Sequence, residues 1–156
     1  MKKNVNWKVL IICLIVVYAV AGIGSFFTSS SVNSGWYQTI KPSITPPNYV
    51  FPVVWNVLFF LVALSLYFSW IKATKKEKKK ITFVFGANFL LNILWSILYF
   101  GMQKPNYAFF ELIVLWFSVL SMILITWKIS KKSAWLLVPY FVWISFAGVL
   151  NYFSAF

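Results

Sequence analysis

Residues 9–27 read VLIICLIVVYAVAGIGSFF, a run with no charged side chain. Four more apolar runs follow, at residues 49–70, 81–101, 107–127 and 134–155. Each provides about the 20 residues that a helix needs to cross a hydrocarbon core about 30 Å thick. Lipid-facing amides must be hydrogen-bonded within their own segment, and none of the runs alternates as a barrel strand does. We therefore predict an all-α membrane protein, with five transmembrane helices in one domain over residues 1–156.

The composition excludes several other classes of protein. The chain is 62% apolar and 10% charged, whereas ordinary soluble domains are about 25% charged. The net charge is +12, but the lysines cluster between apolar runs instead of lining a groove, which argues against nucleic-acid binding. The sequence has no histidine and one cysteine, Cys13, so we expect no metal site, no intrachain disulfide and no Ser-His or Cys-His catalysis.

The lysines also predict the orientation in the membrane. Only Lys41 and Lys104 fall on one side of the predicted spans. By the positive-inside rule the N-terminus is cytoplasmic and the C-terminus lies outside, in a prokaryotic cell membrane. The other side carries Lys2, Lys3, Lys8, Lys72, Lys75, Lys76, Lys78, Lys79, Lys80, Lys128, Lys131 and Lys132. We expect the cluster from Lys75 to Lys80 to contact anionic lipid.

The first run has a second interpretation. Residues 1–8 are basic, an apolar stretch follows, and Ala19-Val20-Ala21 is similar to a signal-peptidase site. Cleavage there would leave four spans. The remaining loops would lie on the same sides of the membrane in both cases, so their charges do not distinguish the two interpretations. We expect the first span to be retained.

The connection between the first two spans, residues 28–48, is long for so compact a chain. Loops of about 20 residues are often lids over a site, and the alternative is a tolerated linker. The segment is dense in rigid and aromatic side chains, which favours a packed structure: Trp36, Tyr37, Pro42, Pro46 and Pro47. We predict that it caps a ligand pocket.

Polar and aromatic residues inside the spans indicate where that pocket lies, because polar groups in hydrocarbon are costly. On three spans such residues recur at helical spacing on one face. A flat, largely apolar aromatic ligand would suit these groups, although amides can also simply join helices, at about 0.6 kcal/mol each. The residues are Trp55, Asn56, Phe59 and Phe60, then Asn88, Asn92, Trp95, Ser96 and Tyr99, then Tyr140, Trp143, Ala147 and Asn151.

Glu111 is the only carboxylate within a span. A proton-coupled transporter would have to use it. We favour a simpler expectation, that Glu111 lies near the outer surface, where snorkelling and the positive end of its helix support the charge. Pro139 is expected to kink or begin the last span.

Together these motifs resemble the TspO/MBR family, the tryptophan-rich sensory proteins related to the translocator protein. The similarity covers nearly the whole chain, in the family's order. It rests on Gly35-Trp36-Tyr37, Lys41-Pro42, Pro46-Pro47, Val50-Phe51, Val54-Trp55, Leu91-Asn92, Trp95-Ser96, Pro139-Tyr140, Trp143, Phe146-Ala147 and Leu150-Asn151.

The resemblance implies five tilted helices around a pocket, usually in a homodimer. It also implies porphyrins such as protoporphyrin IX and haem, and related hydrophobic aromatic molecules, as ligands, with no cofactor required. Trp55 and Trp143 match a tryptophan pair that bacterial relatives use in light-driven oxidative breakdown of protoporphyrin, so an enzymatic role is open. The implied pocket residues are Trp36, Tyr37, Pro47, Trp55, Asn92, Trp95, Ser96, Trp143 and Ala147.

Three functions remain as hypotheses. The first is a membrane receptor or sensor for porphyrins, with light-dependent degradation as an additional activity. The second is a transporter or exporter of tetrapyrroles or other hydrophobic small molecules. The third is a small subunit that tunes other membrane proteins through its lysine-rich face, for which the chain offers no specific signal.

Overall fold

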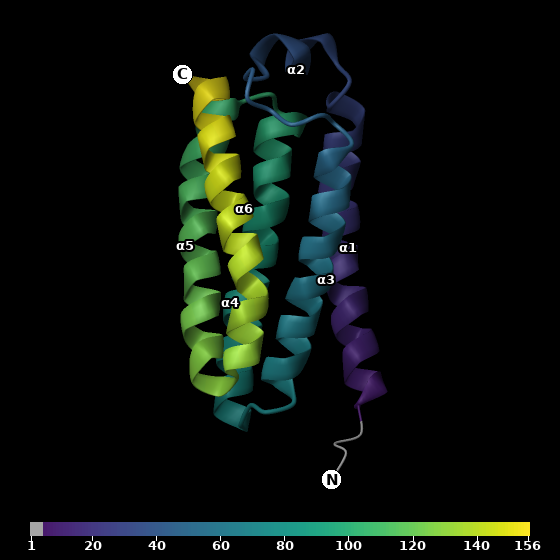
Figure 1. Ribbon diagram of the computed structural model, residues 1–156, viewed down its shortest axis with the longest axis vertical. Helices are drawn as coiled ribbons and strands as arrows, with labels where there is room; N and C mark the ends of the chain where they lie inside the picture. Colours follow the sequence, from purple (N-terminus) through teal and green to yellow (C-terminus); the bar gives the residue numbers. More distant parts are fainter. Residues whose placement is uncertain (1–4) are drawn as a thin grey trace.

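The computed structural model describes residues 5–156, and it is helical throughout (Figure 1). Lys2 and Lys3, which the charge count includes, lie outside the described residues. Five segments are long and apolar enough to cross a membrane, with α4 and η1 forming one of them, so the predicted five-span bundle is confirmed. The elements are α1 (Trp7–Ser31), α2 (Gly35–Ile40), α3 (Val50–Trp70), α4 (Lys75–Ser96), η1 (Ile97–Gly101), α5 (Pro105–Ile129) and α6 (Lys131–Ala155).

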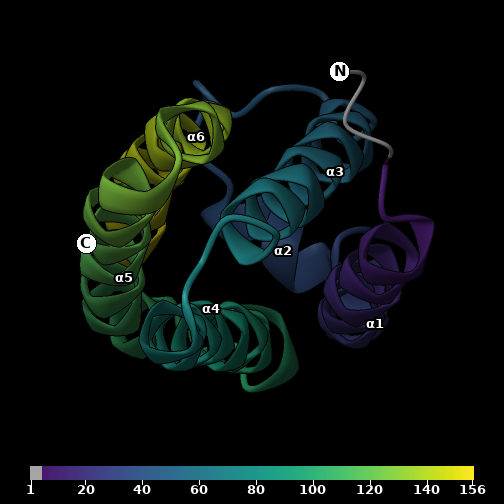
Figure 2. The same cartoon turned by 90° about the horizontal axis from the view of Figure 1, so that it is seen from below.

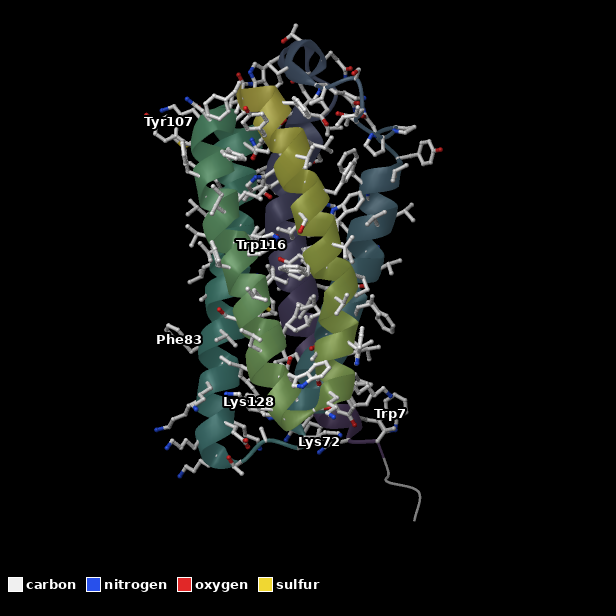
Figure 3. The ribbon with its side chains drawn as sticks, turned by 60° about the vertical axis from the view of Figure 1, so that its left-hand side comes forward. Trp7, Lys72, Phe83, Tyr107, Trp116 and Lys128 are labelled. Carbon is white, nitrogen blue, oxygen red and sulfur yellow. The ribbon has the colours of Figure 1, made fainter. Side chains whose placement is uncertain are left out.

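The five long helices run side by side and form a ring. Seen from one end, the order around the ring is α1, α3, α6, α5 and α4, and α4 returns to α1 (Figure 2). We call the end where α1 begins the lysine end, and Lys72, Lys128 and Trp7 lie there (Figure 3). The opposite end, with α2 and the C-terminus, is the loop end (Figure 1).

Helix α4 shows how the sequence sets the helix ends. The Thr74 hydroxyl accepts a hydrogen bond from the Glu77 N–H at 3.3 Å, and the Glu77 carboxylate accepts one from the Thr74 N–H at 2.8 Å. This capping box begins the helix at Lys75, so α4 extends through the lysine cluster and starts before the predicted residue 81. Pro139 lies inside α6 and does not begin it.

The lysine half of the bundle is solidly packed. The side chains of Ile81, Phe85 and Leu137 are at most 1% exposed. On facing sides of α3 and α6, the Ser65 hydroxyl donates to the Ser133 carbonyl and the Ser133 hydroxyl donates to the Ser65 carbonyl, each at 2.9 Å. Because both side chains are small, the two backbones approach closely and the hydroxyls serve as interhelical links.

Much of the predicted loop 28–48 is helical. Helix α1 continues to Ser31, and the Val32 N–H that follows donates to the Thr28 carbonyl. The Thr28 hydroxyl donates to the Gly24 carbonyl at 3.1 Å. Helix α2 begins after Ser34, whose hydroxyl accepts from the Tyr37 N–H at 3.2 Å. A packed segment was expected here, but not a helix.

The last turn of the third span is a π-turn, which the sequence pattern did not predict. In η1 the Met102 N–H bonds to the Ile97 carbonyl five residues earlier, at 2.7 Å. Gly101 lies against α1, since a Cβ there would be 3.2 Å from a ring carbon of Phe27. The absence of a side chain at Gly101 therefore lets the loop end of this span close onto α1.

Candidate ligand-binding cavity

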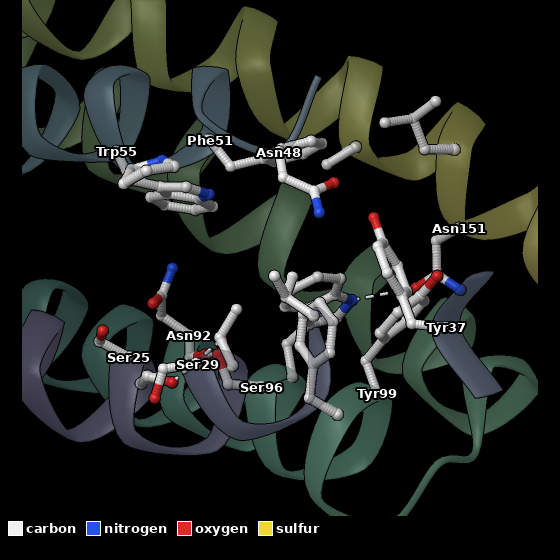
Figure 4. A pocket seen from close by; sticks show the side chains of 18 of the residues that line it. Ser25, Ser29, Tyr37, Asn48, Phe51, Trp55, Asn92, Ser96, Tyr99 and Asn151 are labelled. Atoms are coloured by element: carbon white, nitrogen blue, oxygen red, sulfur yellow. Dashed lines mark hydrogen bonds between the residues drawn. The ribbon is translucent and has the colours of Figure 1, made fainter. Parts of the chain in front are cut away.

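A cavity of about 310 Å³ lies in the loop half of the bundle, between α1, α3, α4 and α6 (Figure 4). Its floor and walls are mostly apolar. The main lining side chains are Gly24, Ser25 and Thr28 from α1; Tyr37, Pro42, Thr45 and Asn48 from the connection; Phe51, Trp55 and Phe59 from α3; Asn92, Trp95, Ser96 and Tyr99 from α4 and η1; and Trp143, Ala147 and Asn151 from α6.

Three indole rings from three helices face this cavity. Trp55 is stacked on Phe59 with ring centres 5.3 Å apart, and Trp95 is stacked on Tyr99 at 5.1 Å. Trp143 completes the wall from α6. Stacked neighbours hold the rings in place and leave their remaining surface for a flat partner, which is the geometry that aromatic ligands require.

Hydrogen bonds behind the wall fix the loop end of the cavity. The Trp95 indole N–H donates to Asn151 Oδ1 at 3.0 Å, and Asn151 Nδ2 donates to the Pro105 carbonyl at 2.7 Å. The Tyr99 hydroxyl donates to Ser154 Oγ at 2.8 Å. Trp95 and Tyr99 are therefore held from α6 and cannot rotate freely.

A second polar chain lies deeper and joins three helices. Asn92 Nδ2 donates to the Tyr140 hydroxyl at 3.1 Å, which donates to Asn88 Oδ1 at 3.3 Å. Asn88 Nδ2 in turn donates to Ser118 Oγ at 2.8 Å. Asn88 thus links α4 to α5 and α6 but does not line the cavity. Asn92 links α4 to α6 and also lines the cavity.

The roof of the cavity carries polar groups from the connection 32–49. The Thr45 hydroxyl is buried and has no hydrogen-bond partner among residues 5–156. Lys41 Nζ donates to Asn48 Oδ1 at 3.2 Å. Burial raises the pKa of the Tyr37 phenol, so its hydroxyl remains protonated at neutral pH.

Seven of the nine implied pocket residues meet at this cavity: Tyr37, Trp55, Asn92, Trp95, Ser96, Trp143 and Ala147. Trp36 and Pro47 do not line it. The Trp36 ring packs edge-on against Tyr99 at 6.0 Å, and Pro47 is exposed, with its carbonyl accepting the Val50 N–H at 2.9 Å. Neither side chain therefore faces the cavity.

Two residues grouped with the pocket residues on the second span face outward. The Asn56 side chain accepts the Tyr18 hydroxyl at 2.9 Å on the exposed side of α3, and Phe60 is 45% exposed. Sequence reasoning also missed the contribution of α1. Ala21, Gly24, Ser25 and Thr28 are small residues at helical spacing on one face of α1, and this spacing is the signal that could have indicated a cavity wall.

The expectation for Glu111 was wrong. Its side chain is only 9% exposed, and neither carboxyl oxygen has a hydrogen-bond partner among residues 5–156. The physical reason is its place on α5, because it shares the inward side of the helix with Ala108 and Leu112 and so cannot snorkel to the surface. Glu111 does not line the cavity.

Five apolar helices around an internal cavity define an integral multi-pass membrane protein with a site of ligand size, since ligand pockets measure about 300–1,000 Å³. The sequence model of the TspO/MBR family matches residues 11–156, and the chain belongs to this family.

Relatives extend across archaea, bacteria and animals. The chain is 38% identical over 144 residues to the tryptophan-rich protein TspO of Archaeoglobus fulgidus, with 92% of each chain covered. It is 36% identical over 146 residues to that of Chlorobaculum tepidum, covering 92% and 91% of the two chains. It is 28% identical over 120 residues to the translocator protein of Bos taurus, covering 75% and 71%. Membership supports a role as a membrane receptor, sensor or transporter.

Proposed function

We propose that the chain is a membrane receptor or sensor that binds porphyrins such as protoporphyrin IX, and related flat aromatic ligands, in the cavity. The observation that carries this proposal is the convergence of Trp55, Trp95 and Trp143 from three helices on one mostly apolar space. Indoles bind flat conjugated rings by stacking and by burying their apolar surface. A ligand of this kind therefore gains contacts on several sides of the cavity.

The size of the cavity indicates how a macrocycle is accommodated. About 310 Å³ is near the lower limit for ligand pockets, so a porphyrin extends beyond the enclosed part. Ser25 and Ser29 of α1 and Pro52 of α3 line the cavity and are also exposed. The rim between α1 and α3 is therefore the side on which the macrocycle projects.

Light-dependent porphyrin breakdown is the finer part of the proposal. Trp55 and Trp143 lie on α3 and α6, and each packs against the other's helix: Trp55 lies 6.1 Å from Tyr140, and Trp143 lies 5.9 Å from Phe51. In this scheme an indole donates an electron to the excited macrocycle, which passes it on to dioxygen and forms superoxide. The indole radical cation then takes an electron from the macrocycle, so the macrocycle is oxidised by one electron and dioxygen is reduced by one. Packing across the helix pair keeps both indoles at the ligand while the electron moves.

The test is a titration of protoporphyrin IX into the purified protein, first in the dark and then under light. Indole fluorescence should be quenched with a defined stoichiometry. Trp55→Phe and Trp143→Phe should remove the light-dependent loss of porphyrin absorbance, whereas Trp135→Phe, a matched control at the lysine end that is 62% exposed, should retain it. Absence of quenching in the wild-type protein would contradict the receptor proposal. If porphyrin binds but neither variant changes the light-dependent loss of its absorbance, only the proposed role of the two tryptophans in photochemistry would be contradicted.

A transporter is the second candidate, and the burial of Glu111 is the observation that favours it. An ionised carboxylate is costly to bury without partners, so a group of this kind exchanges its proton when its surroundings change. Transport predicts porphyrin flux across sealed proteoliposomes that depends on a pH gradient, with Glu111→Gln removing the dependence. Binding without flux would exclude this candidate.

The proposed receptor sits with its lysine end in the cytoplasm of a prokaryotic cell. The support is the gathering of Lys72, Lys128 and most other lysines at one end of the bundle (Figure 3). In a variant with Cys13→Ser and Ser34→Cys, an impermeant thiol reagent applied to intact cells should label residue 34. Labelling only after cell lysis would reverse the orientation.

A further inference from the structure

The two ends of the cavity differ chemically. Its deep side is built from the indoles and Phe59, whereas its roof presents the side chains of Tyr37, Thr45 and Asn48. No carboxylate lines the cavity. Glu77 belongs to the helix cap at the lysine end, and Glu111 is enclosed within the bundle. The roof is thus a polar end without negative charge.

Asn48 is held so that it can donate a hydrogen bond. Its Oδ1 accepts from Lys41 Nζ at 3.2 Å, which leaves the amide group Nδ2 as the free end of the side chain. That group has one weak contact of 3.5 Å to Asn33 Oδ1, and its second N–H remains available. Figure 4 shows Asn48 reaching into the cavity from the roof.

Thr45 adds a second donor with an unmet requirement. Its hydroxyl is buried on the cavity wall with no hydrogen-bond partner among residues 5–156, and a buried unpaired polar group is costly. An acceptor atom on a ligand would satisfy it. The Asn48 amide and the Thr45 hydroxyl both line the cavity, and the Lys41 ammonium lies behind Asn48, so the roof suits the oxygen atoms of an anion.

We propose that the roof binds the carboxylate of an aromatic acid, and that Asn48 and Thr45 select such acids over their neutral esters. Lys41 is a positioning residue, because it orients the Asn48 amide and supplies the positive charge behind it. This inference rests on the proposed function, since it requires that aromatic ligands occupy the cavity. It assigns the direction of binding: rings deep in the membrane, acid groups toward the loop end.

The experiment compares protoporphyrin IX with its dimethyl ester, which has the same macrocycle but no ionised carboxylate. Binding is followed in the dark by indole quenching. The wild-type protein should bind the acid at least about tenfold more tightly than the ester, as expected for hydrogen bonds to a charged group. Lys41→Met and Thr45→Val should reduce this ratio toward one by weakening acid binding, while ester binding, which also reports correct folding, stays within about twofold.

Lys104→Met is the matched control, because Lys104 is the other lysine near the loop end and its Nζ lies over the Tyr107 ring, away from the cavity. It should leave the ratio unchanged. A ratio near one in the wild-type protein would overturn the inference while the proposed function stands. Equal losses in Lys104→Met and Lys41→Met would also overturn it, because general surface charge would then explain the preference. Failure of both ligands to bind would contradict the proposed function itself.

Discussion

The lysine half and the loop half of the bundle use the same helices in opposite ways. In the lysine half α3 and α6 meet at Ser65 and Ser133, which are fully buried and exchange hydrogen bonds. In the loop half the same two helices carry Trp55 and Trp143, and a cavity of about 310 Å³ lies between them and their neighbours. One helix pair is thus joined at one end and held apart at the other.

The comparison shows that side-chain size sets the helix spacing along a single interface. Small residues let backbones approach until direct hydrogen bonds form, whereas large rings keep the helices apart. Rings that pack against each other, as Trp55 does on Phe59, then occupy the walls and leave the centre open. We therefore expect stability to depend mainly on the lysine half, and the proposed ligand binding to depend on the loop half.

The strongest test of this division is Phe85→Ala. Phe85 is 1% exposed in the lysine half, and removing a buried phenyl ring costs about 3–5 kcal/mol of unfolding free energy. Unfolding in mixed detergent micelles should show this loss, with ligand affinity unchanged in the protein that remains folded. The control is Phe83→Ala, two residues away on the same helix and 75% exposed, which should have little effect (Figure 3). Equal losses for both would refute the division.

Filling the cavity should have the reverse effect. Ala147→Trp places an indole in the open space, so we expect porphyrin affinity to fall at least about tenfold, or about 1.4 kcal/mol, while the unfolding free energy is retained. Val149→Trp is the matched control, since Val149 is on the same helix and is 47% exposed. Unchanged binding in Ala147→Trp, measured by quenching, would show that the ligand lies elsewhere.

A smaller effect is expected where α3 and α6 meet. Ser65→Ala removes one of the two reciprocal hydrogen bonds, which should lower the unfolding free energy by about 0.6–1.7 kcal/mol, the range for polar contacts between membrane helices. Ser121→Ala is the control, because the Ser121 hydroxyl bonds only to the Phe117 carbonyl of its own helix. A loss for Ser121→Ala as large as that for Ser65→Ala would remove the special role of this contact.

The smallest effect concerns a wall of the cavity. Trp95→Phe keeps an aromatic ring but loses the N–H that donates to Asn151, so unfolding should weaken by only about 0.6 kcal/mol. The change should appear more clearly as faster dissociation of the ligand, because the ring is no longer tied to α6. Stopped-flow release of porphyrin measures it, and a rate identical to the wild-type rate would contradict this assignment.

The sequence was sufficient for the spans because lipid makes length and apolarity decisive. It was also sufficient to predict the face of the third span that lines the cavity, since helical spacing places Asn92, Trp95 and Ser96 on one face. It could not settle Glu111, because a carboxylate in the second turn of a span is compatible with either surface or interior. Only the neighbours of α5, which come from distant sequence, determine that it is buried.

The connection 28–48 shows a different limit. Its rigid residues predicted packing, but the capping Ser34 and the short helix after it are weak local signals. Trp36 and Pro47 were expected among the pocket residues, yet neither lines the cavity, and Trp36 packs against Tyr99. The composition of a segment predicts that it packs, but the path of its backbone determines which of its side chains face the cavity.

The π-turn η1 has a consequence for variation in chain length. A π-turn is an α-helical turn that has accepted one extra residue, so the segment Ile97–Gly101 already contains an insertion. Losing one residue there would restore a regular α-helical turn and would leave the helix before it in place. Asn92 and Trp95 precede the turn and would stay in place. The third span can therefore change its length by one residue at this point, and the cavity residues affected would be Tyr99 and Phe100, which lie within the turn.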